Sequence, residues 1–225
     1  KFWNILKKAL VLLNLHKRIS KLFKILEMKK INIDIVKNAH FIGCWNLENN
    51  DLCKDIIKLF ESNKEMQKKG RMGGGYSPTE KKTTDITINP KDLENPKFDV
   101  LKKYMGELHK CYLDYQNQWP FLKSIFKNIN IGRFNIQKYS PGDHFAKLHS
   151  ERTALSSLHR LFAWMTYLND VEDGATTNFN HYEIKIKPEI GKTLIWPAEW
   201  THAHTGEVLN SGTKYIITGW MHFPI

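Results

Sequence analysis

The stretch that decides the fold covers residues 161–197 and reads LFAWMTYLNDVEDGATTNFNHYEIKIKPEIGKTLIWP. It opens with the continuous apolar run LFAWMTYL, passes through the turn NDVEDG, and then alternates strictly at Tyr182, Ile184 and Ile186. A second turn, KPEIG, precedes another short apolar run, TLIW. Short runs separated by turn residues are typical of strands, and strict alternation indicates a strand with one buried face. The stretch therefore predicts consecutive strands of a β-sandwich or jelly roll.

The flanking sequence adds further strands downstream and helices upstream. Near-alternation over 129–136 and a final run over 214–223 extend the series of strands, and a short Thr/Ile alternation predicts one more at 84–88. Upstream, 49–62 begins with an Asn/Asp cap and continues with apolar residues at helical spacing, and 98–118 is a second amphipathic helix. Helices followed by many short strands predict a mainly β fold with supporting N-terminal helices.

Composition places the chain among globular proteins and excludes several classes. The 225 residues are 41% hydrophobic and 12% aromatic, which is unlike a disordered chain. No apolar run approaches the roughly 18 to 20 residues that a membrane-spanning helix needs. The three cysteines, Cys44, Cys53 and Cys111, have neither zinc-site spacing nor an even count. We therefore expect a reducing, cytoplasmic location and no disulfide framework.

The formal charge of +11 is concentrated at the start of the chain. Residues 1–30 carry nine basic side chains and one acid, which leaves about +3 for the remaining 195 residues. Apolar residues at helical spacing among these lysines are compatible with a basic amphipathic leader that contacts a membrane surface or a partner, although membrane contact is not the interpretation that we favour. Two alternatives stay open: an ordinary helix packed on the domain, or sequence outside the natural product, since the chain starts with Lys and Met28 offers a start. No specific nucleic-acid partner is expected from the remainder.

This charge distribution and the strand pattern predict the domain organisation. Residues 1–30 form the leader, and 31–225 form a single domain. Within that domain, 31–120 supply helical support and 121–225 supply the jelly-roll core.

Three separated residues predict a metal site. His149 and Glu151 are two positions apart, so in an extended strand both side chains point to the same face. A third ligand from a distant strand, His204, would complete two imidazoles and one carboxylate on one face of an octahedron. That set, with open positions opposite, is typical of non-haem iron(II) oxygenases. A single His-x-Glu pair is weak evidence among ten histidines, so the flanking sequence has to carry the assignment.

Four blocks around these residues occur in a fixed order: YSPGDHFAKLHSE at 139–151, TYLNDVEDGATTNF at 166–179, KPEIGKTLIWP at 187–197 and HTGEVLNSGTKY at 204–215. Together they resemble the catalytic domain of the 2-oxoglutarate/Fe(II)-dependent dioxygenases of the prolyl 4-hydroxylase type. The resemblance covers 139–223. It implies a double-stranded β-helix, which is the cupin-like jelly roll.

The resemblance also implies an activity and a set of site residues. The enzyme would hydroxylate a C–H bond of a peptide or a small molecule, consuming 2-oxoglutarate and O2 and releasing succinate and CO2, with ascorbate as an optional reductant. His149, Glu151 and His204 would bind Fe(II) and form the catalytic centre. Lys214 would pair with the distal carboxylate of 2-oxoglutarate. The remaining pocket positions implied by the family are Tyr139 and Tyr167, through their hydroxyls, and Thr177 and Trp220, as walls.

Two departures and one competing residue accompany this resemblance. Glu151 stands where most relatives have Asp, so the longer side chain must fold back toward the metal. Phe145 lies one residue further from His149 than the aromatic residue of many prolyl hydroxylases, and it lacks a hydroxyl. His202 competes with His204 as the distal ligand, and the ten-residue offset to Lys214 selects His204.

Two other functions are compatible with the residues. A cupin-type metalloenzyme would use His202, His204 and Glu207 without 2-oxoglutarate, and a non-catalytic jelly-roll module would only bind a partner. Substrate choice is expected to depend on the loops at 68–82 and 152–160. The sequence leaves the substrate and the oligomeric state open.

Overall fold

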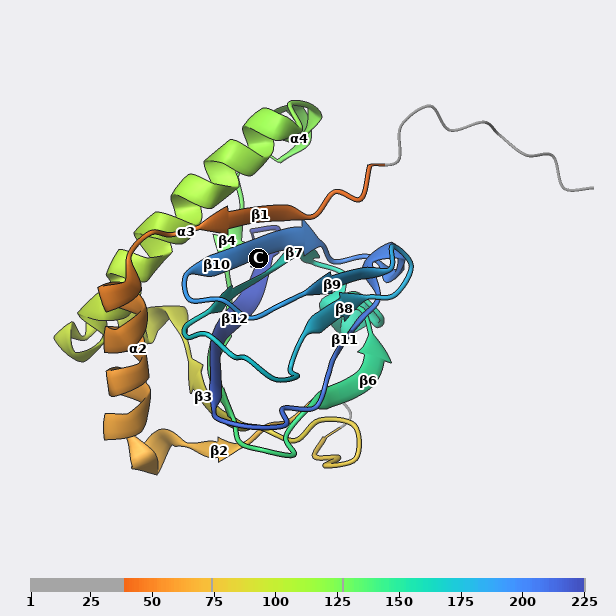
Figure 1. Ribbon diagram of the computed structural model, residues 1–225. Coiled ribbons are helices and arrows are strands. Elements are labelled where there is room, and N and C mark those ends of the chain that lie inside the picture. Colours follow the sequence, from red (N-terminus) through yellow and green to blue (C-terminus); the bar gives the residue numbers. More distant parts are fainter. Residues whose placement is uncertain (1–38, 74, 127, 225) are drawn as a thin grey trace, which may run out of the picture. The chain divides into compact units, whose positions relative to one another are not determined.

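The computed structural model describes residues 39–73, 75–126 and 128–224. The predicted leader at 1–30 lies outside these residues. Two antiparallel β-sheets form the body of the described part, and helices cover one side of it (Figure 1). Within the described residues, no helix combines the length and the apolar character that crossing a bilayer requires.

The larger sheet has eight strands, in the order β1-β10-β7-β12-β5-β3-β2, with β4 paired to β12. Its strands are β1 (Gly43–Asn46), β2 (Lys68–Lys69), β3 (Thr84–Ile88), β4 (Asn130–Ile131), β5 (Phe134–Tyr139), β7 (Arg160–Tyr167), β10 (Lys192–Pro197) and β12 (Lys214–His222). The smaller sheet has the order β6-β11-β8-β9. Its strands are β6 (Phe145–His149), β8 (Thr177–Phe179), β9 (Ile184–Ile186) and β11 (His204–Gly206). The predicted jelly roll is confirmed.

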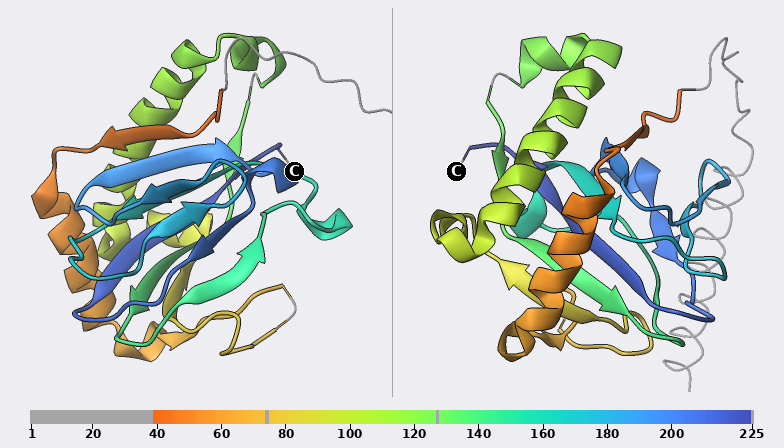
Figure 2. Two further views of the ribbon diagram at one scale, coloured as in Figure 1. Left: turned by 45° about the vertical axis from the view of Figure 1, so that its right-hand side comes forward. Right: turned by 60° about the vertical axis from the view of Figure 1, so that its left-hand side comes forward.

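The helices pack on the outer face of the larger sheet (Figure 2). They are α2 (Asn50–Ser62), α3 (Asp99–Gln118) and α4 (Phe121–Ile125), and short 3-10 turns occur at Lys64–Met66, Pro90–Glu94, Pro96–Phe98, Leu155–Ser157 and Trp200–His202. The Asn49 side chain caps α2 by accepting a hydrogen bond from the backbone N–H of Leu52. Tyr104 of α3 is fully buried, with its ring 5.9 Å from that of Trp164 on β7. Both predicted helices are confirmed within one residue.

The two-residue period of the strands gives the larger sheet two different faces. On β5, Phe134 and Ile136 belong to the core beneath the helices, whereas Gln137 and Tyr139 line a cavity between the sheets. On β12, Ile217 joins the core, and the residues on either side of it line the cavity. Because side chains alternate along a strand, one face of the sheet packs in the core beneath the helices and the other face lines the cavity.

Three details differ from the sequence prediction. The alternation at Tyr182–Ile186 predicts a longer strand than β9, which begins only at Ile184 because 180–183 form a turn in which Glu183 has φ = 56°. The loop predicted at 68–82 contains the two-residue strand β2, paired with β3. Strand β6 ends at His149, so Glu151 lies beyond the strand and not on it.

Candidate metal centre

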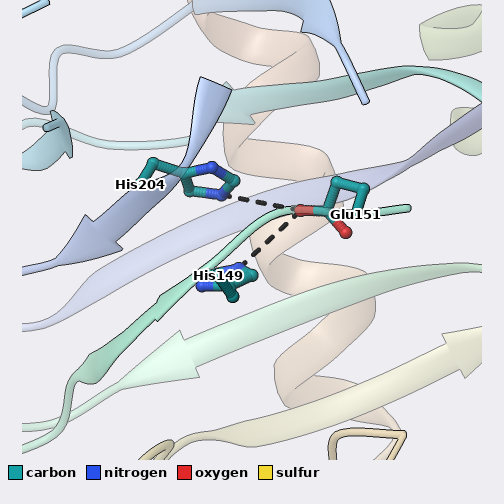
Figure 3. A group of neighbouring side chains, drawn as sticks. All are labelled: His149, Glu151 and His204. Atoms are coloured by element: carbon teal, nitrogen blue, oxygen red, sulfur yellow. Dashed lines mark ion pairs between the residues drawn. The ribbon is translucent and has the colours of Figure 1, made fainter. Parts of the chain in front are cut away.

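His149, Glu151 and His204 come together at one end of the smaller sheet (Figure 3). His149 ends β6 and His204 begins β11, and the two residues are direct partners in the antiparallel register. The Oε1 atom of Glu151 lies 3.7 Å from Nε2 of His149 and 3.5 Å from Nε2 of His204. The potential ligand atoms of the three residues all lie within 4.8 Å of one another. Strand pairing therefore supplies the two imidazoles, and the bend after β6 supplies the carboxylate.

Hydrogen bonds to backbone carbonyls orient both imidazoles. The Nδ1 atom of His149 is 2.8 Å from the carbonyl oxygen of Lys147, and Nδ1 of His204 is 2.9 Å from that of His202. A carbonyl oxygen only accepts hydrogen bonds, so each Nδ1 carries the proton and each Nε2 presents its lone pair to the centre. Burial also lowers the pKa of His204 to about 4, which favours its neutral form. Both rings therefore direct Nε2 toward the centre, as metal ligands would.

The side chain of Glu151 is anchored by Trp220 and Arg160. The indole Nε1 of Trp220 donates a hydrogen bond to Oε2 of Glu151 at 2.6 Å. Arg160 donates from its guanidinium to the backbone carbonyl of Glu151 at 3.0 Å, and its guanidinium carbon lies 3.7 Å from the centroid of the Trp220 ring. These contacts fix one carboxylate oxygen and leave Oε1 directed at the imidazoles. The longer Glu side chain thus reaches the centre.

Phe145 contributes through its ring. It stacks on the imidazole of His149 with a centroid separation of 3.9 Å and an interplanar angle of 15°. The residue that departs from the family pattern by lacking a hydroxyl therefore restricts the rotation of a metal ligand.

The donor set fits Fe(II). Two neutral imidazoles and one carboxylate on one side, with space on the other, are the arrangement used by non-haem iron oxygenases. The space is a cavity of about 1080 Å³ that reaches from the three ligands to the inner face of the larger sheet. In the described part of the chain, this is the one group of three or more His, Cys, Asp or Glu side chains close enough to hold a metal ion.

The alternative cupin-type ligand set is contradicted by the positions of His202 and Glu207. His202 is buried, and its Nε2 lies 2.8 Å from the backbone carbonyl of His40. Glu207 accepts hydrogen bonds from Asn178 and Lys185 at 2.8 and 3.1 Å. His202 therefore supports the centre only through its backbone carbonyl, which accepts from His204.

Lys214 places a buried cation in the same cavity. It begins β12 directly opposite Tyr139 of β5, and only 3% of its surface is exposed. Its Nζ donates to the backbone carbonyl of Ala175 at 3.1 Å and lies 4.1 Å from the centroid of the Tyr139 ring. No carboxylate among the described residues pairs with it, and burial lowers its pKa to about 7. A buried ammonium with unused donors is suited to an anionic ligand.

Comparison with known proteins agrees with this geometry. Residues 134–222 match the 2OG-Fe(II) oxygenase superfamily. These residues are a 2OG-Fe(II) oxygenase domain. The cofactors of the oxygenase are accordingly Fe(II) and 2-oxoglutarate. No curated protein sequence matches the chain.

Solved structures of prolyl hydroxylases share the fold of the oxygenase. The viral collagen prolyl hydroxylase of Paramecium Bursaria Chlorella virus-1, in its 2OG complex, has a TM-score of 0.60 at 16% identity, covering 84% of this chain and 100% of that one. A Pseudomonas putida prolyl-4-hydroxylase has a TM-score of 0.62 at 16% identity, with coverages of 83% and 95%. A Trichoplax adhaerens prolyl hydroxylase, in complex with a hypoxia inducible factor peptide fragment, has a TM-score of 0.64 at 14% identity, with coverages of 82% and 84%. At these identities the likeness establishes the fold.

Among the other predicted pocket residues, Tyr139, Thr177 and Trp220 line the cavity of the oxygenase, and Tyr167 does not. The hydroxyl of Tyr167 donates to Oγ1 of Thr177 at 2.6 Å, so it orients a residue that lines the cavity. The role predicted for the Tyr167 hydroxyl in the pocket stays a prediction. The Tyr139 hydroxyl donates to Oε1 of Gln137 at 3.0 Å.

Sequence reasoning missed two residues of the site, Gln137 and Arg160. Gln137 could have been found, because it lies two positions before Tyr139 in an alternating strand and therefore shares its face. Arg160 gave no such signal, because it precedes an apolar run and its contact with Trp220 joins two strands far apart in sequence.

Replacing Trp220 with Phe should weaken iron binding by about tenfold, because the ring is kept while the hydrogen bond that fixes Glu151 is lost. Anaerobic titration with Fe(II) measures the effect. Trp200 is 69% exposed and does not line the cavity, so Trp200→Phe is the matched control and should bind iron like the wild type. Equal affinities for Trp220→Phe and the wild type would contradict a role for this hydrogen bond.

Proposed function

We propose that the oxygenase hydroxylates an unactivated C–H bond of a residue within a peptide chain, in the manner of a prolyl hydroxylase. One observation carries this proposal: the ligand atoms of His149, Glu151 and His204 face the same cavity as the unpaired ammonium of Lys214. A keto acid bound at the metal thus has a cation within the cavity for its free carboxylate.

The residues of this chain have distinct tasks in such a reaction. Fe(II), with 2-oxoglutarate and O2, supplies an oxidant for the C–H bond and yields succinate and CO2 as co-products. The two imidazoles and Glu151 would hold the metal at the wall of the cavity. Lys214 binds the distal carboxylate by a charge-assisted hydrogen bond. Apolar side chains of the cavity, Met165, Trp196 and Ile216, limit the access of water.

The size of the cavity and the similar structures support a peptide as the substrate. Small-molecule pockets typically measure about 300–1,000 Å³, and this cavity of about 1080 Å³ must also admit 2-oxoglutarate. It extends to the exposed residues Lys68 and Lys69, which form the edge strand β2 of the larger sheet, and to Arg71 after them. Solved structures of similar fold include prolyl hydroxylases, one of them in complex with a peptide fragment. A prolyl residue of a peptide is therefore the first substrate to test.

The test is the release of CO2 by the Fe(II)-loaded enzyme from 2-oxoglutarate that is labelled in the carboxyl group next to the keto group. It is measured with and without a panel of proline-containing peptides. We expect slow release without peptide, several-fold stimulation by at least one peptide, and a mass gain of one oxygen on that peptide. Chelation of the metal should abolish both. Stimulation by free small molecules and by no peptide would overturn the proposal.

A further inference from the structure

We propose that the oxygenase selects an acidic segment of its peptide substrate, held by four basic side chains along one wall of the cavity. We call this group the basic wall; its members are Lys68, Lys69, Arg71 and Arg133. The proposal rests on the proposed function, because it names the class of peptide that the same site accepts.

The basic wall lies at the edge of the larger sheet, away from the Lys214 end of the cavity. Along β5, every second residue lines the cavity, from Tyr139 beside Lys214 to Arg133 just before the strand. At about 3.3 Å per residue, these two residues are separated by about 20 Å. Lys68 and Lys69 form the edge strand β2, and Arg71 follows them. In Figures 1 and 2, β2 and the chain after it lie at the same end of the sheets as the beginning of β6.

The charges of the basic wall are not neutralised within the described part of the chain. All four side chains are exposed, and none has a carboxylate oxygen within 4.0 Å. Three acidic residues also line the cavity, and each has another partner or role. Glu65 pairs with Lys97 at 3.7 Å, Asp85 pairs with the buried Lys81 at 2.9 Å, and Glu151 is the metal ligand. A concave site lined by uncompensated cations attracts anionic ligands.

The uncharged segment that follows Glu151 favours a peptide over a nucleic acid. The segment after Glu151 lines the cavity with small side chains, which are Thr153, Ala154, Ser156 and Ser157. Single-stranded nucleic-acid sites combine cations along a groove with aromatic platforms for the bases. Here three of the four aromatic residues of the cavity contact the metal ligands: Phe145 stacks on His149, Trp196 lies 5.2 Å from the ring of His204, and Trp220 donates to Glu151. The fourth, Tyr139, lies beside Lys214.

An extended peptide fits a cavity that has cations along one wall and small uncharged side chains in the segment after Glu151. Its side chains alternate between two faces, so one face can direct carboxylates to the basic wall while a neighbouring residue points toward the iron. The cations are exposed, and they need no fixed geometry to select for charge. Selection would therefore concern the net charge of the segment and tolerate different acidic sequences.

The experiment compares two fluorescent nine-residue peptides with a central proline, one carrying four Glu and the other four Gln at the same positions. Their binding to the Fe(II)- and 2-oxoglutarate-loaded enzyme is measured without oxygen by fluorescence anisotropy. At low salt we expect the Glu peptide to bind at least about tenfold more tightly, with the difference shrinking as salt is raised. The double variant Lys68→Glu/Arg133→Glu should lose at least about tenfold in affinity for the Glu peptide and little for the Gln peptide.

The double variant Lys91→Glu/Lys103→Glu is the matched control, because both lysines are exposed and neither lines the cavity. It should bind both peptides like the wild type. Equal affinity for the two peptides, no binding of either, or the same loss in the control would overturn the proposal. Tighter binding of a single-stranded DNA 12-mer that is lost in Lys68→Glu/Arg133→Glu would assign the basic wall to nucleic acid and also overturn it.

CO2 release, which tests the proposed function, is measured on the same enzyme preparation. Stimulation of CO2 release by the Gln peptide, without preference for the Glu peptide, would remove the acidic selection and leave peptide hydroxylation standing. If no peptide of either kind bound or stimulated CO2 release, the proposal of peptide hydroxylation would be contradicted as well.

Discussion

Replacing Lys214 with Met should raise the KM for 2-oxoglutarate by about 100-fold and at the same time make the metal-free protein more stable. The first effect follows because a buried charge-assisted hydrogen bond contributes on the order of 2–3 kcal/mol and Met offers no donor. The second follows because the ammonium is buried without a carboxylate partner, and Met has a similar length without the charge. Succinate formation at varied 2-oxoglutarate and denaturant unfolding measure the two effects.

The pH dependence of stability provides an independent check on the same variant. Burial lowers the pKa of Lys214 from 10.5 to about 7 in the folded protein. The unfolded chain therefore binds more protons than the folded one between pH 7 and about 10.5, and the contribution of Lys214 to stability rises with pH in that window. Lys214→Met lacks this contribution, so its advantage over the wild type should be largest below pH 7, on the order of 2 kcal/mol after loss of the hydrogen bond to Ala175.

Lys138→Met is the matched control for Lys214→Met. Lys138 forms an ion pair with Glu61 at 2.8 Å, outside the cavity, and this contact raises its pKa. Its replacement should slightly lower stability and leave the KM for 2-oxoglutarate unchanged. A Lys214→Met variant that is less stable than the wild type, or that has a normal KM, would contradict the role assigned to this lysine.

Replacing His149 with Ala should weaken Fe(II) binding by at least 100-fold and abolish succinate formation. The imidazole is one of three protein ligands, and its Nδ1 hydrogen bond and its stacking on Phe145 hold Nε2 in place for the metal. Co(II) substitution gives an optical signal for the site that does not depend on activity. His109→Ala, on the exposed side of α3, should bind metal like the wild type.

The same measurement separates the centre described here from a cupin-type site. A cupin-type site built on His202, His204 and Glu207 would keep its metal in His149→Ala and lose it in Glu207→Gln. The geometry predicts the reverse, because Glu207 is hydrogen-bonded to Asn178 and Lys185, away from the centre.

Parts of the fold and of the catalytic centre could be predicted from local sequence. Helices α2 and α3 were predictable because their apolar residues repeat at helical spacing and pack on one surface. The His-x-Glu pair brings two ligands close together in any extended chain, even though the strand ends at His149. The ten-residue offset from His204 to Lys214, which matches the family pattern, selected the distal ligand; in the structure this connection crosses from the smaller sheet to the larger one, and both residues line the cavity.

The sequence by itself predicted the jelly roll, because strand periodicity is a local property, and its resemblance to the oxygenase family assigned the three metal ligands. Only the tertiary structure showed which other residues contact the metal ligands or line the cavity. The bond from Trp220 to Glu151 and the different contacts of Tyr139 and Tyr167, which share the inner face of the larger sheet, depend on how distant strands pair. The basic wall joins β2 to the start of β5 through β3. Strand register and long-range pairing arise from the packing of the whole sheet, and no short segment encodes them.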